Sequence, residues 1–504
     1  MAASRARRAG ARHALLIVPI AVAAAVGTVT LGPILATQRA PDLIGALVPA
    51  PTASPSPIQT TAPSPSPSPT AAASPAPTAT GTPPPTPAST TALPSAMPSA
   101  ASPSYAPGSP TASAPAATSP SPGPVAGAPP TAEPPTSITR PRLAPATRLA
   151  LQARLDRLRE RYAIPGISVA IVLPDGSTWL GVSGMADVAA ETPVTRSTSF
   201  AIASVSKTFT AALILALAED GRIDLNAPVR RYLPALKKIS VKVKVRHLLD
   251  HTSGLRDYFF HASIDKLLLS RPDRRWDATQ AMKYVGKAYF EAGKGWHYSN
   301  TNYLVLGMLA EAVGDAPLAD QVRERFLRPL DLDHTWYQPE DKAPVDVAHG
   351  YRFASSARTA PAIDLSDGTP LVPFTSVVTA AGGAGGFAAS ADDLAHWAHA
   401  LYGGDVLTPD YLEAMVDVAG TAAVKAAIPY GYGVQAIEID GRRTVGHSGR
   451  LLGFRSAVRY LPDQGVSIAV LTNQSRTDPG PILRSLLRLA LTPVDDPCRC
   501  REHR

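Results

Sequence analysis

Apolar residues recur at helical spacing near position 150, which predicts a helix at the start of a globular region. The leucines that carry this pattern are Leu149, Leu151, Leu155 and Leu158. The next two apolar runs, 166–173 and 177–183, are separated by a Pro-Asp-Gly turn and are typical of two paired strands. The segment 205–219 is almost wholly apolar and stops before Gly221, so we expect a buried helix that ends at the glycine.

Four segments near the end of the region are typical of successive strands, at 432–439, 444–448, 456–460 and 466–471. A last helix is expected over 481–490, and the middle of the region is helix-rich in pattern. Strands at both ends with helices between them favour an α+β fold. We expect a central antiparallel sheet built from both chain ends and flanked by helices, with a helix-rich second lobe, over residues 141–493.

The first 40 residues have a different pattern. Four arginines within residues 1–13 precede an uncharged stretch over 14–36. As a helix these 23 residues would measure about 34 Å, enough to cross a hydrocarbon core of about 30 Å. We expect residues 1–40 to be either a signal anchor with its basic head in the cytoplasm or a signal peptide that is cleaved. Both interpretations export the rest of the chain, anchored in the cell membrane through residues 14–36 or secreted.

Residues 41–140 form a predicted linker. Between Pro51 and Arg140 there are 26 prolines in 90 residues, and nearly all the others are Ser, Thr, Ala or Gly. Such a segment has almost nothing to bury, so we expect it to be disordered with polyproline II character. It would be a stalk that holds the globular domain away from a membrane, and the alternative is a spacer with no required length. Residues 494–504 form a charged tail, and the roles of its Cys498 and Cys500 stay open.

The charge of the chain does not indicate a nucleic-acid partner. The formal net charge is +8 over 504 residues, but residues 1–140 carry six arginines against two acids. The globular region is therefore nearly balanced and has no broad phosphate-binding face. Two cysteines in the whole chain exclude a disulfide scaffold and a Cys-rich zinc fold.

A Ser-x-x-Lys tetrad occurs twice, at Ser204–Lys207 and at Ser263–Lys266. Ser204 begins the apolar helix, and residues three apart share a helix face, so Lys207 would lie beside the Ser204 hydroxyl. Burial would lower the pKa of Lys207, and a neutral amine could then take the serine proton. The helix N-terminus would favour an oxyanion. Ser263 lies in a polar stretch, and we interpret it as a solvated helix start.

Two further motifs follow. Tyr298-Ser-Asn300 could place a phenol with a depressed pKa near the lysine, and Asn300 could bind both Lys207 and a substrate amide. The alternative is a turn with a structural tyrosine and a capping asparagine. His447-Ser-Gly449 lies on what we expect to be an edge strand, open to a ligand backbone. The alternative there is a loop with an exposed histidine.

The three motifs, in this order and with their flanks 200–210, 247–255 and 446–454, resemble those of the serine β-lactamase and penicillin-binding superfamily. The chain is most similar to the class C-like branch, which includes a D-alanyl-D-alanine carboxypeptidase, class C β-lactamases and related esterases. The resemblance covers about 350 residues. His447 stands where class C β-lactamases usually have lysine, which lowers the expectation of efficient β-lactam hydrolysis.

The resemblance implies an acyl-enzyme on Ser204, with Lys207 and Tyr298 sharing the general acid and base work. It also implies that Asn300 orients the substrate and the lysine. Further positions that would bind substrate or orient the site are His447, Ser448 and Gly449. The backbone N–H groups of Ser204 and Arg450 would form the oxyanion hole.

We therefore expect an exported serine hydrolase of the D-alanyl-D-alanine carboxypeptidase type that acts on cell-wall peptides. The alternatives are an esterase or weak β-lactamase, and a catalytically silent surface-binding homologue. Substrates would be a small peptide, an ester or a β-lactam, with peptidoglycan as a partner of a monomeric protein. No cofactor and no metal are expected. His247 and His251 have a spacing that could bind zinc, but we interpret them as scaffold residues. We interpret the glycine-rich segment 382–386 as a tight loop.

Overall fold

The computed structural model describes residues 143–492, except 345, 354, 356, 358 and 359. The predicted signal anchor or signal peptide over 1–40, the linker over 41–140 and the tail over 494–504 lie outside the described residues, so they remain predictions. None of the helices within the described part of the chain is long and apolar enough to span a bilayer.

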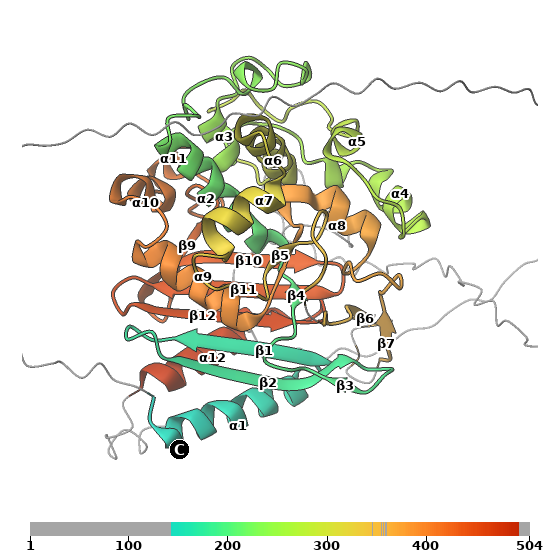
Figure 1. The fold of residues 1–504 in the computed structure, drawn as a ribbon, viewed down its shortest axis with the longest axis vertical. Helices are drawn as coiled ribbons and strands as arrows, with labels where there is room; N and C mark the ends of the chain where they lie inside the picture. The colour runs from blue at the N-terminus through green and yellow to red at the C-terminus, as the bar shows by residue number, and fades with distance from the viewer. Residues whose placement is uncertain (1–142, 345, 354, 356, 358–359, 493–504) are drawn as a thin grey trace, which may run out of the picture. The chain divides into compact units, whose positions relative to one another are not determined.

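A seven-stranded antiparallel sheet forms the centre of the domain, in the order β3-β2-β1-β12-β11-β10-β9. Its strands are β1 (Gly166–Val172), β2 (Thr178–Asp187), β3 (Thr192–Pro193), β9 (Gln435–Ile439), β10 (Arg442–Leu451), β11 (Phe454–Leu461) and β12 (Val466–Thr472). The two ends of the region meet where β1 pairs with β12, with Ile167 opposite Thr472. Figure 1 shows the teal and red strands side by side. The predicted α+β fold with a sheet built from both ends is confirmed.

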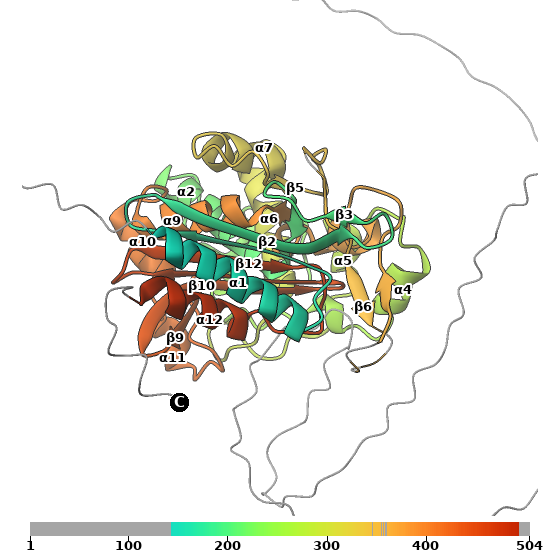
Figure 2. The same cartoon turned by 90° about the horizontal axis from the view of Figure 1, so that it is seen from below.

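Two helices cover one face of this sheet, α1 (Pro145–Arg161) and α12 (Gly480–Leu491) (Figure 2). The predicted leucine stripe of α1 is confirmed from Leu151 onward, because Leu151, Leu155 and Leu158 are buried against the sheet and α12. Leu149 is an error in that prediction: its side chain is 74% exposed. A leucine two positions before Leu151 lies about 200° away around a helix, so it cannot share the buried stripe.

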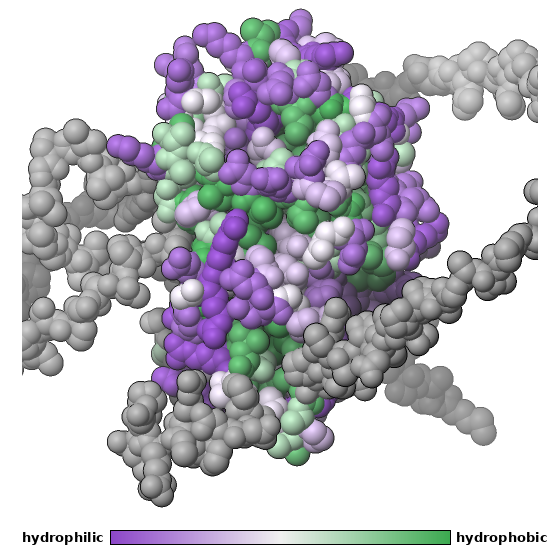
Figure 3. All heavy atoms as spheres, turned by 90° about the vertical axis from the view of Figure 1, so that its left-hand side faces the viewer, coloured by the Kyte–Doolittle hydropathy of each residue, from purple (hydrophilic) through white to green (hydrophobic). Residues whose placement is uncertain are grey.

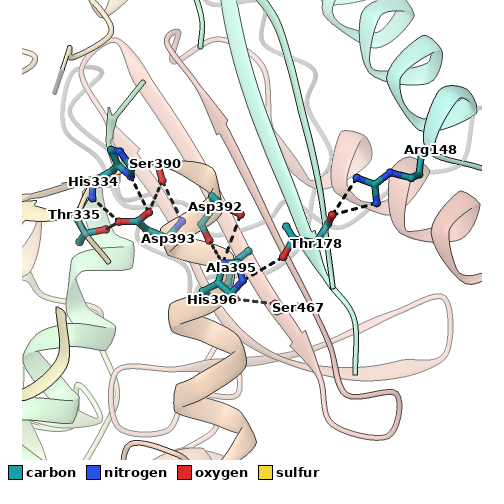
Figure 4. A network of polar contacts seen from close by, with 10 residues as sticks. All are labelled: Arg148, Thr178, His334, Thr335, Ser390, Asp392, Asp393, Ala395, His396 and Ser467. Carbon is teal, nitrogen blue, oxygen red and sulfur yellow. Dashed lines mark hydrogen bonds and ion pairs between the residues drawn. The ribbon is translucent and has the colours of Figure 1, made fainter. Parts of the chain in front are cut away.

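The opposite face is covered by α9 (Ala391–Gly403). Polar contacts hold this helix to the strands (Figure 4). The His396 imidazole shares a hydrogen bond of 3.2 Å with the Thr178 hydroxyl on β2, and Ser467 on β12 donates to the Ala395 carbonyl at 2.7 Å. The carbonyl of Thr178 accepts from Arg148 on α1. Strand β2 is therefore fixed from both faces of the sheet.

The second lobe is helix-rich, as predicted. Its elements are α2 (Ser206–Glu219), α3 (Val245–Leu249), α4 (Ile264–Ser270), α5 (Ala278–Met282), α6 (Asn300–Gly314), α7 (Leu318–Val322), α8 (Thr375–Ala381), α10 (Pro409–Val416) and α11 (Ala419–Ala423). Every residue of α2 except its last is buried, and Gly221 follows with a φ of +71°. The predicted buried helix with a glycine stop is confirmed.

Short strands complete the domain. A three-stranded sheet has the order β4 (Phe200–Ala201), β8 (Phe387–Ala389) and β5 (Trp336–Tyr337), and β6 (Tyr351–Phe353) pairs with β7 (Ala362–Asp364). The pairing of β4 with β8 brings the segment before Ser204 alongside the segment after the glycine-rich loop. Ser263 is an exposed residue directly before α4, as its interpretation as a solvated helix start requires.

Figure 3 shows one face of the domain, in which hydrophilic residues dominate the upper part and hydrophobic residues form patches between them. The most exposed large apolar side chains of the described residues come from three segments, and they are Leu149, Met185 with Val188, and Val241. Scattered apolar residues of this kind are normal on a folded domain and indicate no docking surface by themselves.

Candidate active site

Ser204 lies in a single 3-10 turn, Ala203–Val205, that joins β4 to α2. Ala203 has a φ of +50°, a left-handed conformation that costs an alanine about 1 kcal/mol. The reversal turns the chain sharply between strand and helix and leaves Ser204 partly exposed while its neighbours are buried. Ser204 therefore lies two residues before the start of α2 rather than beginning it, and it is still at the positive end of that helix.

Lys207 lies one turn after Ser204 with its side chain completely buried. Its Nζ donates to Ser204 Oγ at 3.1 Å, to Asn300 Oδ1 at 2.9 Å and to the Ala384 carbonyl at 2.6 Å. Burial lowers the pKa of Lys207 to about 7, and the charge of Asp257 offsets part of that effect. A large fraction of the amine is therefore neutral near pH 7 and can accept the Ser204 proton.

Asp257 is a buried carboxylate that the sequence prediction missed. Its Oδ2 accepts from the backbone N–H and the Nδ2 of Asn300, at 3.0 and 2.8 Å. These bonds fix the orientation of the amide, so that Oδ1 of Asn300 faces Lys207. Burial raises the pKa of Asp257, and the N–H groups that it accepts from oppose this rise. The sequence feature that could have indicated this role is the position of Asp257 directly before the aromatic run 258–260.

Tyr298 lies beside this chain of contacts, with Lys207 Nζ 5.0 Å from the centre of its ring. The expectation of a depressed pKa is wrong: burial raises the pKa of Tyr298 well above its usual range, and the Ser204 hydroxyl offsets only part of this rise. The phenol oxygen forms no ordinary hydrogen bond within the described part of the chain. Tyr298 is therefore a protonated phenol at neutral pH, free to meet a ligand.

His447 is buried, which excludes the alternative of an exposed loop. Its Nδ1 donates to the Ser448 carbonyl at 2.6 Å, and its Nε2 accepts from the Tyr430 hydroxyl at 2.9 Å. Burial and the charge of Lys207 hold the pKa of His447 well below its usual range, so the ring is neutral. The contacting Tyr430 was not predicted, because its partner lies 17 positions away on another element.

Strand β10 is an edge strand over part of its length. Its pairing with β9 ends where Gly446 faces Gln435, while its pairing with β11 continues to Leu451. The prediction of an edge at 447–449 is therefore correct, although β9 covers the first half of the strand. A Cβ on Gly449 would lie 2.3 Å from the Ile202 carbonyl oxygen, so only glycine lets β10 approach the turn that holds Ser204.

One cleft gathers all the predicted site residues. Those that line it are Ser204, Tyr298, Asn300, His447, Ser448, Gly449 and Arg450. Lys207 reaches the same place through its bond to Ser204. The free volume of the cleft is about 50 Å³. Whether the N–H groups of Ser204 and Arg450 act as an oxyanion hole stays a prediction.

Comparison with known proteins agrees with this geometry. Residues 151–492 match the family model described as Beta-lactamase. The chain belongs to the β-lactamase family. The resemblance found in the three motifs and the expected serine hydrolase class are thereby confirmed.

Individual members of the family show how far the similarity extends. The chain is 29% identical to a D-aminopeptidase of Brucella anthropi over 330 residues, which are 64% of this chain and 59% of that protein. It is 29% identical to penicillin-binding protein 4* of Bacillus subtilis, over 64% of this chain and 71% of that protein. The D-amino acid amidase of Ochrobactrum anthropi SV3, solved with D-phenylalanine, superposes with a TM-score of 0.58 at 26% identity, covering 68% of this chain and 98% of that one. The chain thus spans about three fifths of the length of its D-aminopeptidase relatives.

Within this family fold, the glycine-rich segment 382–386 has a role that the sequence did not reveal. It forms the predicted tight loop, with a 3-10 turn over Gly382–Ala384. The Ala384 carbonyl accepts the shortest of the three bonds from Lys207, so the loop positions the amine. A backbone carbonyl carries no sequence signature, which explains why this contact was missed.

The two histidines considered as zinc ligands make scaffold contacts instead. His247 Nδ1 accepts from the Lys244 backbone, and His251 Nδ1 accepts from Asn302 Nδ2 at 2.9 Å. Within the described residues, one group has the spacing of metal ligands, Asp187, His349 and Asp364. His349 shares a bond of 2.8 Å with Asp364, and none of the three lines the cleft.

Proposed function

We propose that this chain is an exported serine hydrolase of the D-alanyl-D-alanine carboxypeptidase type, acting on cell-wall peptides. Ser204 Oγ attacks the carbonyl carbon before the terminal residue, and its proton passes to neutral Lys207. The scissile C–N bond breaks, Tyr298 gives a proton to the leaving amine, and Lys207 returns one to Tyr298. Water then releases the acyl group from Ser204. The observation that carries this proposal is the 3.1 Å contact of Ser204 Oγ with an amine whose pKa is lowered to about 7.

The charge of the cleft supports a substrate with a free carboxylate and no free amine. Of its described lining residues none is Asp or Glu, and Arg450 is the single formal cation among them. A peptide with an acylated amine and a terminal carboxylate matches this balance. A substrate with an α-ammonium group would lack an anionic partner in the cleft.

Hydrolysis of D-amino acid amides and of peptides with a free D-residue at the N-terminus is the second candidate. It is favoured by the D-aminopeptidase and D-amino acid amidase relatives. Both candidates break an amide bond whose carbonyl belongs to a D-residue, so they share the acyl-enzyme. They differ in whether the amine of that D-residue is acylated, as in the carboxypeptidase substrate, or free, as in the second candidate.

The location is also a proposal. The predicted signal anchor or signal peptide and the proline-rich linker would place the domain outside the cytoplasmic membrane, either anchored or secreted. Cell fractionation with an antibody to the domain tests this part. Recovery of the intact chain in the cytoplasmic fraction would contradict it.

The second Ser-x-x-Lys tetrad supplies a matched control for the chemistry. Ser204→Ala in the full chain should abolish covalent labelling by fluorescent penicillin, and Ser263→Ala should leave it unchanged. Release of D-Ala from diacetyl-Lys-D-Ala-D-Ala, without turnover of D-phenylalanine amide, selects the carboxypeptidase. The reverse pattern selects the second candidate, and labelling that persists in Ser204→Ala rejects both.

A further inference from the structure

A second cavity lies on the α12 face of the sheet, behind the strand that carries His447 to Arg450. It has a volume of about 140 Å³, and its apolar wall is made by Ile428, Ile437, Ile439, Ala457 and Leu483. Cavities of this size hold a small organic molecule or a few waters. Ser448 and Gly449 line both this cavity and the active-site cleft, so the two spaces meet around the free edge of β10.

Two buried arginines of β11 form the polar side of this cavity. Arg455 is 7% exposed and Arg459 is 4% exposed, and alternation along the strand points both toward α12. Burial lowers the pKa of each guanidinium to about 10, so both remain cationic at neutral pH. Neither forms an ion pair with a carboxylate of the described residues.

Among the fully buried nitrogen atoms of these two arginines, one has no hydrogen-bond partner in the described residues. Arg459 Nη2 donates to Gln435 Oε1 at 2.8 Å, and Arg455 Nε donates to the Ser475 carbonyl at 3.0 Å. Arg455 Nη1 is buried and has no acceptor within the described part of the chain. A buried cationic donor without an acceptor is costly, and an anion in the cavity would remove that cost.

The charge around the cavity indicates what kind of anion fits. The exposed Asp478 at its rim is the carboxylate that attracts both guanidinium groups, so about one positive charge is left uncompensated. The N-terminus of α12, a helix of 12 residues, adds positive potential from Gly480. A planar guanidinium matches a carboxylate, and the apolar wall matches a short alkyl chain.

We propose that this cavity is a binding site for a small aliphatic monocarboxylate. The bound carboxylate accepts from Arg455 Nη1, and its alkyl chain packs on the isoleucines of β9. Occupancy is coupled to the active-site strand, because Arg459 and the Ser448 hydroxyl both donate to Gln435 Oε1.

Titration of the full chain with butyrate at constant ionic strength tests the site, with neutral butyramide as the matched ligand. Butyrate should bind and butyramide should not. Arg455→Gln should weaken binding by about 10- to 100-fold, the usual range for a hydrogen bond to a charged group. Arg443→Gln, which removes an exposed arginine of β10, should leave it unchanged. The proposal is overturned if butyrate and butyramide bind with equal affinity, or if Arg455→Gln and Arg443→Gln bind butyrate with equal affinity.

Asp478→Asn keeps the proposal testable if Arg455→Gln does not fold. Asparagine can still accept the Gly480 N–H that Asp478 Oδ1 accepts at 3.0 Å. Removing the rim carboxylate should tighten butyrate binding by about two- to fivefold, as expected for one partly exposed charge. Weaker binding in this variant contradicts the site.

The carboxylate could belong to a free anion or to the substrate, and kinetics separate these sources. The possibility that the substrate supplies the carboxylate rests on the proposed carboxypeptidase function. If the substrate carboxylate enters the cavity, butyrate raises the KM for a D-Ala-D-Ala peptide but not for its C-terminal amide. If a free anion is the ligand, butyrate changes kcat or leaves both constants unchanged. Direct butyrate binding is read without turnover, so loss of the proposed activity and loss of the site give different results.

Discussion

The pH dependence of Ser204 acylation is the most direct test of the proposed chemistry. Lys207 must be neutral to take the proton from Ser204, and burial sets its pKa at about 7. The neutral fraction of such an amine is about 10% at pH 6, about 50% at pH 7 and about 90% at pH 8. The rate should therefore rise with pH by about tenfold between pH 6 and pH 8 and then level off.

Stopped-flow acylation of the full chain by a fluorescent penicillin, at constant ionic strength, gives this profile without deacylation. Asp257→Asn should move its midpoint to lower pH, because the buried carboxylate raises the pKa of Lys207. His349→Asn changes a titratable residue outside the cleft and should leave the midpoint where it is. A rate that is flat from pH 5 to 9, or that falls as pH rises, would refute the role of Lys207 as the base.

Three further changes test other parts of the site. The pKa of Lys207 is lower in the folded state than in the unfolded state, so the unfolded chain binds more protons between pH 7 and pH 10. The unfolding free energy of the wild type, relative to that of Lys207→Met, should therefore rise by about 1 kcal/mol per pH unit over this range in denaturant titrations. Gly449→Ala would place a Cβ 2.2 Å from Ser456 Oγ, and it should cost about 1–3 kcal/mol in unfolding free energy and slow acylation; an unchanged rate would show that β10 does not need this close approach. Tyr430→Phe leaves Nε2 of His447 buried without a donor, and should lower thermal stability by about 1–3 kcal/mol while the Ser204 label still forms.

The sequence was sufficient for those parts of the site that depend on short spacing. Ser204 and Lys207 are three positions apart on one helical turn, so their contact follows from helix geometry alone. The strands β1 and β12 were found because their apolar runs are nearly continuous, and both are buried on both faces.

Contacts between distant segments were not predictable in the same way. Asp257 reaches Asn300 across 43 positions, and Ala384 reaches Lys207 across 177. The raised pKa of Tyr298 depends on how completely the folded chain excludes water from the phenol, which spacing does not encode. Burial therefore determined each point at which the chemistry differed from expectation.

That same burial links the stability of the domain to its chemistry. A neutral Lys207 is less costly to enclose than a charged one, and its three hydrogen-bond partners, Ser204, Asn300 and Ala384, come from three separate segments. The two N–H groups of the neutral amine donate to Asn300 Oδ1 and the Ala384 carbonyl, and its lone pair accepts from the Ser204 hydroxyl. Each partner is supplied by a different part of the fold: the turn after β4, the first residue of α6 and the glycine-rich loop. Displacement of any one of these segments would admit water, raise the pKa of the amine and remove the neutral base near pH 7. The integrity of both lobes is therefore a condition for the reactivity of one hydroxyl group.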